Sequence, residues 1–558
     1  MKRLRGSFST LRWVGKSIGP ARGSLAFLFF VKILQGVEGI VFAFGLRKVI
    51  DAAVDGDRTA LRDGIWMLAA LVVIAIVAYW CAIYYTEKPA SKLGKALRAH
   101  VFSQLLRRSY ADVSRVHSGE WMTRLNSDTV VVGKAVCTIL PSLAGMIVQI
   151  TCAFLSLFLI LPRVAWMLIP CGMALIAVSL FLRVKLKAYH MMVQQKEGVV
   201  YSYLQEHLES MSVIRTYTKE ETSEQEAAEK LNDLVDVRLK RARFTATCAT
   251  AIYALVRIGY FIGVILCGTR LLNGVLTYGM MMAVLQLIRQ AEAPLADVTH
   301  AVPQFFNMLA SAERLMEIEK TPTDYDGNLH TPEEARAFYD AKLAAFGLRN
   351  VSFAYGADSE EVLSGRSFTI RKGEYVAFTG ESGCGKSTTM SLMMGLYVPD
   401  SGEVFLQDSD GGEQSLSAEW RALFAYVPQK NLLLSGTIRD VVAFSEHAKE
   451  TVGDEEIMEA LRIACADGFT AELPDGLDTM LGERGSGLSE GQMQRIAIAR
   501  AIFSKRPILM LDEATSALDE ETEKTLLENL RTMTDRTVLI ITHRPAALAI
   551  CDNEIHFG

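Results

Sequence analysis

The chain has 558 residues, half of them hydrophobic, and its mean hydropathy of +0.21 is high for a soluble protein of this size. A net charge of −5 does not indicate a nucleic-acid partner, and the length allows two or more domains. The nine cysteines lack paired spacing, and six lie in or beside apolar runs, so we interpret these six as small buried hydrophobic residues.

The first half of the chain contains six apolar stretches, each about as long as the roughly 20 residues that cross a membrane. They lie at 25–45, 65–85, 139–161, 164–182, 246–268 and 279–299. The last is interrupted by Arg289, Glu292 and Asp297. We therefore expect an all-α membrane domain with six spans in residues 1–318, in contact with the lipid bilayer. The alternative is a soluble core of buried helices.

Lysine and arginine are unevenly distributed between these stretches. Residues 1–23 hold six and no acid, 86–134 hold nine, and 183–243 hold eleven. The positive-inside rule then places the N-terminus and both long connections in the cytoplasm. Within these connections, GEWMTRLNSDT (119–129) and YLQEHLESMSVIRTYTKEE (203–221) are predicted to dock another domain. Solvated helix faces are the alternative.

Charged side chains within the apolar stretches form a further group of candidates. They are Lys32, Glu38, Arg257, Arg289 and Glu292. Charges are costly in lipid and usually face protein or water. These side chains can line a substrate path, pair with one another, or lie near the membrane surface.

The character of the sequence changes after residue 318. Residues 319–342 are polar and contain Pro and Gly, which predicts a linker. Short β-rich runs then alternate with helical segments over 343–558, which is typical of an α/β domain with a mainly parallel sheet.

The stretch GESGCGKST (380–388) matches the pattern G-x-x-x-x-G-K-[ST] between a predicted strand and a predicted helix. Its glycines let backbone N–H groups approach phosphate oxygens. Lys386 can reach the β- and γ-phosphates of ATP, and Ser387 can offer a hydroxyl to Mg²⁺. The predicted ATP-binding residues of this loop are Gly380, Ser382, Gly383, Cys384, Gly385, Lys386, Ser387 and Thr388. A chance glycine-rich turn is the alternative.

The apolar run ILMLDE (508–513) ends in two carboxylates. Two adjacent acids at the end of a buried strand need a cation or a chemical role. Asp512 is predicted to hold Mg²⁺, directly or through water. Glu513 is predicted to polarise the attacking water as the general base. An exposed turn is the alternative.

Two more polar residues follow apolar runs, Gln429 after LFAYVP and His543 after VLIIT. Ligands of open parallel sheets lie beyond the carboxyl ends of the strands, so these side chains should gather with Lys386, Asp512 and Glu513. His543 can donate to the γ-phosphate, and Gln429 can contact Mg²⁺ or the attacking water. A lone His or Gln is more often structural.

A second candidate phosphate site lies in SGLSEGQMQR (486–495). Ser489 and Gln492 fit a capping box, in which both side chains satisfy free N–H groups at the start of a helix. Such a helix end attracts anions because its amides point outward and its dipole is positive there.

In this order, the motifs resemble those of an exporter-type ATP-binding-cassette (ABC) half-transporter, with the membrane domain first. They are the phosphate loop GESGCGKST (380–388), the Q-loop YVPQ (426–429), GERG (482–485) before the signature, the signature LSEGQ (488–492), Walker B ILMLDE (508–513), the D-loop SALD (516–519) with Asp519, and THR (542–544) with the switch histidine. Tyr355 matches the aromatic residue that stacks on adenine, although an aromatic residue in a strand more often belongs to the core.

The resemblance implies a P-loop NTPase domain with the helical subdomain of ABC proteins, and an ATPase that needs ATP and Mg²⁺. Two cassettes close head to tail on two ATP molecules, each ATP lying between one phosphate loop and the partner's signature residues. Those residues are Ser489, Gly491 and Gln492. The docking segments 119–129 and 203–221 resemble the coupling helices that pass this closure to the membrane domain.

With one cassette, the chain needs a second half-transporter. A homodimer is favoured because Glu513 and His543 are both present, and a heterodimer stays open. The resemblance implies export across a bacterial plasma membrane, with a cytoplasmic ATPase domain. The alternatives are an exporter-fold importer and an ATP-gated channel or regulator. The signature departs from the family pattern at one position. It most often reads LSGGQ, and here Glu490 replaces the first glycine. The charge of Glu490 would lie near a bound γ-phosphate unless the side chain points away.

Overall fold

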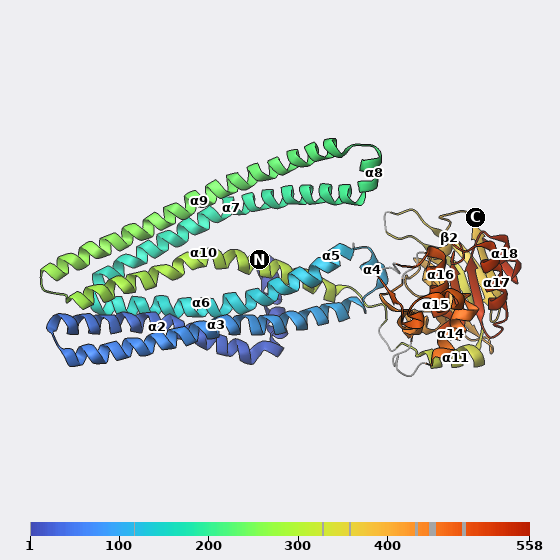
Figure 1. Cartoon of the computed structure of the whole chain (residues 1–558), viewed down its shortest axis with the longest axis horizontal. Helices are drawn as coiled ribbons and strands as arrows, with labels where there is room; N and C mark the ends of the chain where they lie inside the picture. The colour runs from blue at the N-terminus through green and yellow to red at the C-terminus, as the bar shows by residue number, and fades with distance from the viewer. Residues whose placement is uncertain are drawn as a thin grey trace. The chain divides into compact units, whose positions relative to one another are not determined.

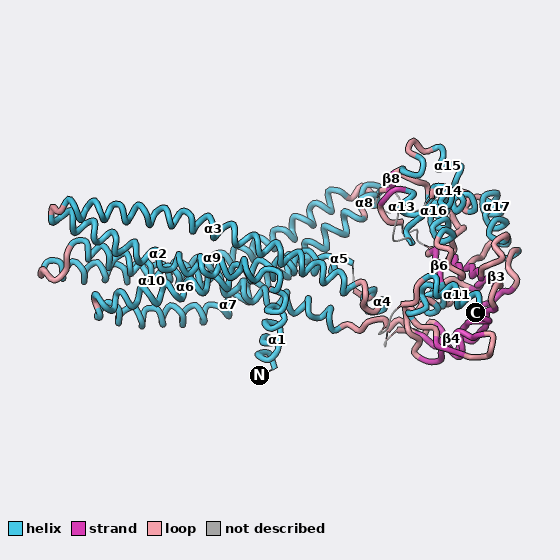
Figure 2. Tube along the Cα trace, turned by 90° about the horizontal axis from the view of Figure 1, so that it is seen from below, coloured by secondary structure: helices cyan, strands magenta, loops and turns pink. Residues whose placement is uncertain are grey.

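The computed structural model describes residues 2–116, 118–325, 329–356, 359–429, 433–445, 453–482 and 487–557, so GERG (482–485) lies mostly outside the described residues. The chain divides into two compact units (Figures 1 and 2). The helical unit comprises Met1–Gln104 and Ser118–Lys320, and the α/β unit comprises Leu105–His117 and Thr321–Gly558.

Among the described residues, the helical unit has six helices of more than 30 residues. They are α2 (Arg22–Asp55), α3 (Arg58–Leu105), α6 (Thr129–Ile160), α7 (Pro162–Glu209), α9 (Glu220–Leu272) and α10 (Tyr278–Lys320). The shorter elements are α1 (Lys2–Ser17), η1 (Gly19–Ala21), α5 (Ser118–Thr123), the π-helix η2 (Arg124–Asp128) and α8 (Met211–Thr216). The predicted apolar stretches fall in the six long helices in order.

Length and composition qualify four of the described helical segments as membrane spans, namely 22–55, 58–105, 118–160 and 220–272. The count of six spans therefore stays a prediction.

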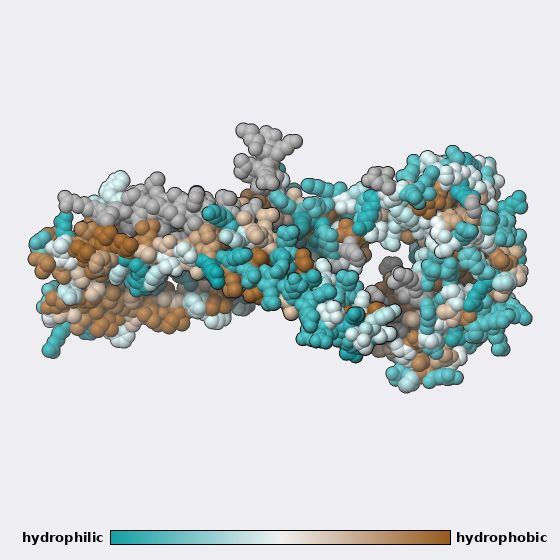
Figure 3. Space-filling view, turned by 90° about the horizontal axis from the view of Figure 1, so that it is seen from above, coloured by the Kyte–Doolittle hydropathy of each residue, from teal (hydrophilic) through white to brown (hydrophobic). Residues whose placement is uncertain are grey.

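Exposed apolar side chains gather on the half of the helical unit that carries the α2–α3 and α9–α10 turns (Figure 3). On α3 they are Ile65, Trp66, Val72, Val73, Ile74, Ile76, Val77, Tyr79, Trp80 and Ile83. Soluble monomers rarely expose a contiguous apolar surface of this kind, whereas lipid would cover it. The alternative of a soluble core is wrong, because these side chains face outward.

Helices α2 and α6 approach closely where two glycines meet. A Cβ atom at Gly36 would lie 2.7 Å from the carbonyl oxygen of Gly145, and one at Gly145 would lie 2.8 Å from that of Lys32. Small residues of this kind let helix backbones pack tightly in lipid. Nearby, Gln149 donates to the side-chain oxygen of Gln290 on α10 at 2.5 Å and to its backbone oxygen at 3.0 Å.

The C-terminal part of α10 makes polar contacts with α1 and with the residue that precedes α6. Asp128, at the end of η2, is buried and accepts hydrogen bonds from Arg314 Nε and Nη2 at 2.8 and 2.6 Å and from Ser311 Oγ at 2.8 Å. Glu319 accepts from the indole N–H of Trp13 at 2.8 Å. These contacts attach α1 and the start of α6 to α10.

Asp128→Asn should lower the free energy of unfolding by about 1–3 kcal/mol, because a buried charged acceptor loses its charge-assisted hydrogen bonds. The measurement is the thermal midpoint of the purified full chain in detergent. The control is Asp233→Asn, which removes an exposed ion pair with Lys196 and should leave the midpoint unchanged. Equal shifts in the two variants would contradict the proposed stabilising role of Asp128.

The strands of the α/β unit form a parallel sheet in the order β11-β3-β10-β9-β6, an antiparallel sheet in the order β2-β1-β4-β5, and the pair β7-β8. Their bounds are β1 (Leu343–Phe353), β2 (Leu363–Arg371), β3 (Tyr375–Gly380), β4 (Ser401–Asp408), β5 (Glu413–Ser415), β6 (Phe424–Val427), β7 (Gly436–Thr437), β8 (Met480–Leu481), β9 (Ile508–Asp512), β10 (Thr537–Ile541) and β11 (Asn553–Phe557). The predicted parallel α/β domain is confirmed.

Helical elements make up the rest of the described α/β unit. They are α4 (Tyr110–Ser114), α11 (Pro332–Ala341), α12 (Lys386–Met393), η3 (Ala418–Leu423), α13 (Ile438–Val442), η4 (Ala443–Ser445), α14 (Asp454–Ile463), α15 (Asp467–Glu472), η6 (Gly476–Asp478), α16 (Glu490–Phe503), α17 (Glu520–Arg531) and α18 (Pro545–Ala549). Along β9, Ile508 and Met510 join the core shared with β1 and β4, and Leu509 and Leu511 join the core shared with α14 and α16. Both faces are buried, which explains the unbroken apolar runs of these strands.

The predicted linker, 319–342, contains the helix α11. Thr331 and Glu334 form a capping box at its start. Tyr339 is buried, and its hydroxyl lies 2.9 Å from Thr537 Oγ1 in the parallel sheet. The α/β unit therefore includes α11, whose residues Ala335 and Tyr339 are buried in the core of that unit. The boundary at 343 stays a prediction.

The docking roles of the two predicted segments stay predictions. Residues 119–129 form α5 and η2 in the helical unit, whereas the stretch 105–117 just before them belongs to the α/β unit and contains α4. The second segment, 203–221, forms the end of α7, α8 and the start of α9. The contacts of α4 therefore lie within the α/β unit.

Candidate nucleotide-binding site

The phosphate loop joins β3 to α12, and each of its glycines is required by local geometry. Gly380 has φ of 129°, and a Cβ there would lie 1.9 Å from the carbonyl oxygen of Phe557. Gly385 has φ of 96°, and a Cβ would lie 2.6 Å from Leu363 Cδ2. Gly383 has φ of 88°, which side chains rarely adopt. The loop can therefore curl with its backbone close to a ligand.

Lys386 opens α12 and is buried inside this loop. Its ammonium donates to the carbonyl oxygens of Gly380 and Glu381, both at 2.7 Å, and lies 3.6 Å from Cys384 Sγ. Ser382 is exposed at the tip of the loop. A positive charge thus lies beside the backbone that would receive phosphate oxygens.

Asp512, at the end of β9, connects three elements. Its Oδ1 accepts from Ser387 Oγ on α12 and its Oδ2 from the hydroxyl of Tyr426 on β6, both at 3.1 Å. Burial raises the pKa of the Asp512 carboxyl, and the two hydrogen bonds act in the opposite direction. Burial also raises the pKa of Tyr426, together with the neighbouring carboxylate.

The donor set around Asp512 suits Mg²⁺. A carboxylate beside a serine hydroxyl is the pair that phosphate loops offer to this ion, which keeps several waters and phosphate oxygens as further ligands. Within the described part of the chain, no group of three or more His, Cys, Asp or Glu side chains forms a self-contained metal site. The ion would therefore depend on the nucleotide for much of its coordination.

The remaining polar residues lie at the same sheet edge. Gln429 Nε2 donates to Glu513 Oε2 at 2.7 Å. Glu513 has φ of 49°, and its backbone N–H donates to Ile541 at 3.1 Å, so the chain turns sharply after β9. Non-glycine residues in this conformation are strained and concentrate at functional sites. His543 follows the neighbouring strand β10 and is exposed. The structure thus brings Gln429 to Glu513 and places His543 after the neighbouring strand of the same sheet.

The capping box of the signature stretch is confirmed. Ser489 Oγ accepts from the backbone N–H of Gln492 at 3.3 Å, and Gln492 Oε1 accepts from that of Ser489 at 2.9 Å. A Cβ at Gly491 would lie 2.8 Å from the carbonyl oxygen of Ala517, so glycine lets α16 approach the D-loop. Glu490 is exposed in the first turn, where the helix dipole favours a negative charge. Among the described residues, no hydrogen bond joins this helix start to the phosphate loop.

Two residues that the sequence analysis missed hold the D-loop. Gln494 is buried, donates to Ser516 Oγ and accepts from the backbone N–H of Ala517, both at 3.1 Å. Arg544 donates to the carbonyl oxygen of Ser516 at 2.8 Å and to Glu523 Oε2 at 2.8 Å. Two signals in the sequence could have indicated these residues. Gln494 is a polar residue among the apolar residues of the signature helix, and Arg544 directly follows His543.

Asp519 ends the D-loop as the cap of α17. Its side chain accepts from the backbone N–H of Thr522 at 2.9 Å, and this bond lowers the pKa of the Asp519 carboxyl. The D-loop is thus held at one end by a helix cap and in its middle by Gln494 and Arg544. These contacts connect the signature helix, the D-loop and the residue after the switch histidine.

Gln494→Ala should lower the free energy of unfolding by about 0.5–1.5 kcal/mol, because two part-buried hydrogen bonds, to Ser516 and Ala517, are lost. It should also speed backbone hydrogen exchange over 516–519. Thermal melting and exchange of the full chain measure both effects. Gln414→Ala, at an exposed position on β5, is the matched control. Unchanged exchange in Gln494→Ala would show that the D-loop does not depend on this side chain.

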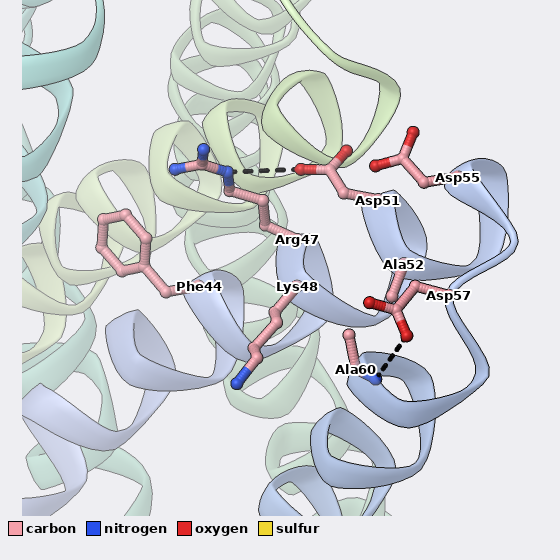
Figure 4. Close-up of a pocket in the computed structure, with 8 residues that line it drawn as sticks. All are labelled: Phe44, Arg47, Lys48, Asp51, Ala52, Asp55, Asp57 and Ala60. Carbon is pink, nitrogen blue, oxygen red and sulfur yellow. Dashed lines mark hydrogen bonds and ion pairs between the residues drawn. The ribbon is translucent and has the colours of Figure 1, made fainter.

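A separate pocket of about 330 Å³ lies in the helical unit where α2 meets α3 (Figure 4). It is lined by Phe44, Arg47, Lys48, Asp51, Ala52, Asp55, Asp57 and Ala60. Asp51 accepts from the backbone N–H of Gly279 at 2.9 Å and from Thr277 Oγ1 at 3.0 Å, and Asp57 accepts from the N–H groups that open α3. Two of its acids therefore stabilise the helix turns.

Two family models match this chain, one in each half. The family model for the ABC transporter transmembrane region matches residues 25–295, and the ABC transporter model matches residues 363–516. Both occur in one chain, with the membrane region first. The chain belongs to the ABC transporters. It is an integral membrane protein of the exporter type that binds ATP and couples ATPase activity to transport.

Curated relatives align over most of the transporter. A putative export ATP-binding/permease protein of Rickettsia bellii is 27% identical over 91% of this chain and 87% of its own. An ATP-dependent lipid A-core flippase of Syntrophus aciditrophicus is 29% identical over 87% and 80%. A multidrug resistance ABC transporter protein of Lactococcus lactis is 28% identical over 95% and 88%.

A solved bacterial Atm1-family ABC exporter with ATP bound has a TM-score of 0.80 to this transporter at 22% identity. The alignment covers 96% of this chain and 93% of that chain. At this identity the likeness demonstrates the fold, a helical membrane domain followed by an ATP-binding cassette.

Proposed function

We propose that two copies of this transporter form a homodimeric exporter that hydrolyses ATP with Mg²⁺ between its two cassettes. Residues 1–318 supply the membrane domain, 319–342 the connection, and 343–558 the cassette. The observation that carries the proposal is the polar cluster at the carboxyl edge of the parallel sheet. There Asp512 ends β9, Glu513 directly follows it, and Lys386 opens α12.

Nucleotide binding involves both ends of ATP. The backbone N–H groups of the loop 380–388 and the ammonium of Lys386 would bind the phosphates. Tyr355 is 43% exposed, so its ring can receive adenine. Ser387, Asp512 and Gln429 would hold Mg²⁺, which would neutralise charge on the β- and γ-phosphates.

Hydrolysis would use Glu513 as the base. Its carboxylate accepts a proton from water as the water oxygen attacks the γ-phosphorus, and the bond to the ADP oxygen breaks. The hydrogen bond from Gln429 orients Glu513. His543, exposed at the end of the adjacent strand, would donate to a γ-phosphate oxygen.

The second ATP contact supports a dimer. The capped start of α16 presents outward-pointing amides at Ser489, Gly491 and Gln492, which suit the γ-phosphate of ATP held by a second copy. Because this chain carries both Glu513 and His543, two identical chains would provide two competent sites. Closure of the cassettes would drive alternating access of the membrane domains.

Export across a bacterial plasma membrane, with cytoplasmic N-terminus and cassette, is the direction we propose. Its support is the basic character of the connections 86–134 and 183–243 and the exporter, flippase and drug-resistance names of bacterial relatives. ATP-dependent accumulation of an ATPase-stimulating compound inside inverted vesicles tests this. Accumulation in right-side-out vesicles alone would contradict export.

Glu513→Gln should lower ATP turnover at least about 100-fold, because the amide cannot accept the proton of the attacking water. ATP binding should persist, since the phosphate loop is unchanged. Turnover is measured by phosphate release, and binding by equilibrium titration of the full chain.

Glu520→Gln, an exposed change on α17, is the matched control and should leave turnover unchanged. Lys386→Ala should weaken ATP binding itself, which separates binding from hydrolysis. Normal turnover in Glu513→Gln would refute the assignment of the base.

A further inference from the structure

The short helix α4 contacts the residues that surround Tyr355. Arg115 Nη2 donates to the carbonyl oxygen of Tyr355 at 3.0 Å. Ser114 Oγ lies 3.4 Å from the hydroxyl of Tyr397, and the rings of Tyr110 and Tyr397 meet edge to face with centroids 5.7 Å apart. Because α4 directly follows α3 in the chain, this contact leads from a membrane helix to the base side of the ATP site.

Tyr355 is in turn held by its side chain. Its ring is perpendicular to that of Tyr397, at 89° with centroids 5.3 Å apart, and it packs edge to face on Phe353 at 5.2 Å. Its hydroxyl lies 2.8 Å from Thr388 Oγ1 in the phosphate loop. Perpendicular aromatic contacts depend on orientation, so a change in the Tyr355 ring alters its contact with Tyr397.

A second set of bonds anchors α4 without Tyr397. The backbone N–H of Ser109 donates to the carbonyl oxygen of Pro322 at 2.9 Å, and that of Tyr110 donates to Asp324 Oδ1 at 3.0 Å. Arg421 Nη2 donates to the other oxygen of Asp324 at 2.7 Å. The attachment of α4 and its contact with the tyrosines can therefore be perturbed separately.

We propose that Tyr397 is a positioning residue through which α4 responds to the base of the bound nucleotide. A purine stacked on Tyr355 would fix the orientation of that ring, and the perpendicular contact with Tyr397 would pass this orientation to Tyr110 and Ser114. Coupling would then depend on the base as well as on the phosphates. The proposal rests on the proposed function, because it requires ATP at this site.

The test uses the full chain in nanodiscs and hydrogen exchange over residues 105–116. In the unmodified protein, saturating ATP should slow exchange there more than saturating UTP, whose smaller base stacks more weakly. In Tyr397→Leu the ATP-induced slowing should fall by about tenfold and match that with UTP. The KM for ATP and the basal kcat should stay unchanged. Tyr397→Phe keeps the ring and should restore most of the ATP response.

Asp324→Asn is the control for the anchor, and should speed exchange over 105–116 equally with and without nucleotide. A full ATP response in Tyr397→Leu, or equal responses to ATP and UTP in the unmodified protein, would overturn the proposal. A loss of response that follows a raised KM would also overturn it, since Tyr397 would then act through affinity alone. Failure of the proposed function would appear separately, as absent ATP hydrolysis in the unmodified protein.

Discussion

Asp512 joins three parts of the cassette through two hydrogen bonds, to Ser387 at the start of α12 and to Tyr426 at the end of β6. Removing a carboxylate from water is costly unless it is paired or has a cation nearby. The strands that converge on Asp512 can be apolar on both faces because their polar groups are collected at one edge. Asp512 lies next to Glu513, which accepts a hydrogen bond from Gln429 at the same edge.

In the helical unit, apolar and polar side chains are also separated, but lipid takes the place of water around part of the surface. The apolar side chains of α3 face outward, where lipid would cover them. Helices do not associate in lipid through the hydrophobic effect, so α2 and α6 pack through the close approach of their backbones at Gly36 and Gly145. Asp128, at the end of η2, is a buried charge. It pairs with Arg314, which lies near the C-terminal end of α10. Polar contacts thus hold the helix that continues into the α/β unit.

The contacts of α4 and of the D-loop show how the cassette connects its parts. Arg544 and Gln494 link the signature helix, the D-loop and the end of β10. On the other side, Tyr397 links α4 to Tyr355. Gln494 and Tyr397 lie outside the phosphate loop, Q-loop, signature, Walker B and D-loop stretches, and Arg544 lies directly after the switch histidine. These three side chains connect the residues that are assigned to the chemistry.

Local patterns in the sequence determined much of this protein. The glycines around Lys386 and the Ser489–Gln492 capping box are set by bonds within a few residues, and unbroken apolar runs ending in polar residues are sufficient to predict a parallel sheet with a polar edge. The place of α4 in the α/β unit, the packing of α11 within 319–342, and the contacts of Tyr426 and Gln494 were decided by the tertiary structure. Each depends on partners tens or hundreds of residues away, and a polar helix or a buried glutamine carries no local sign of which partner it will meet.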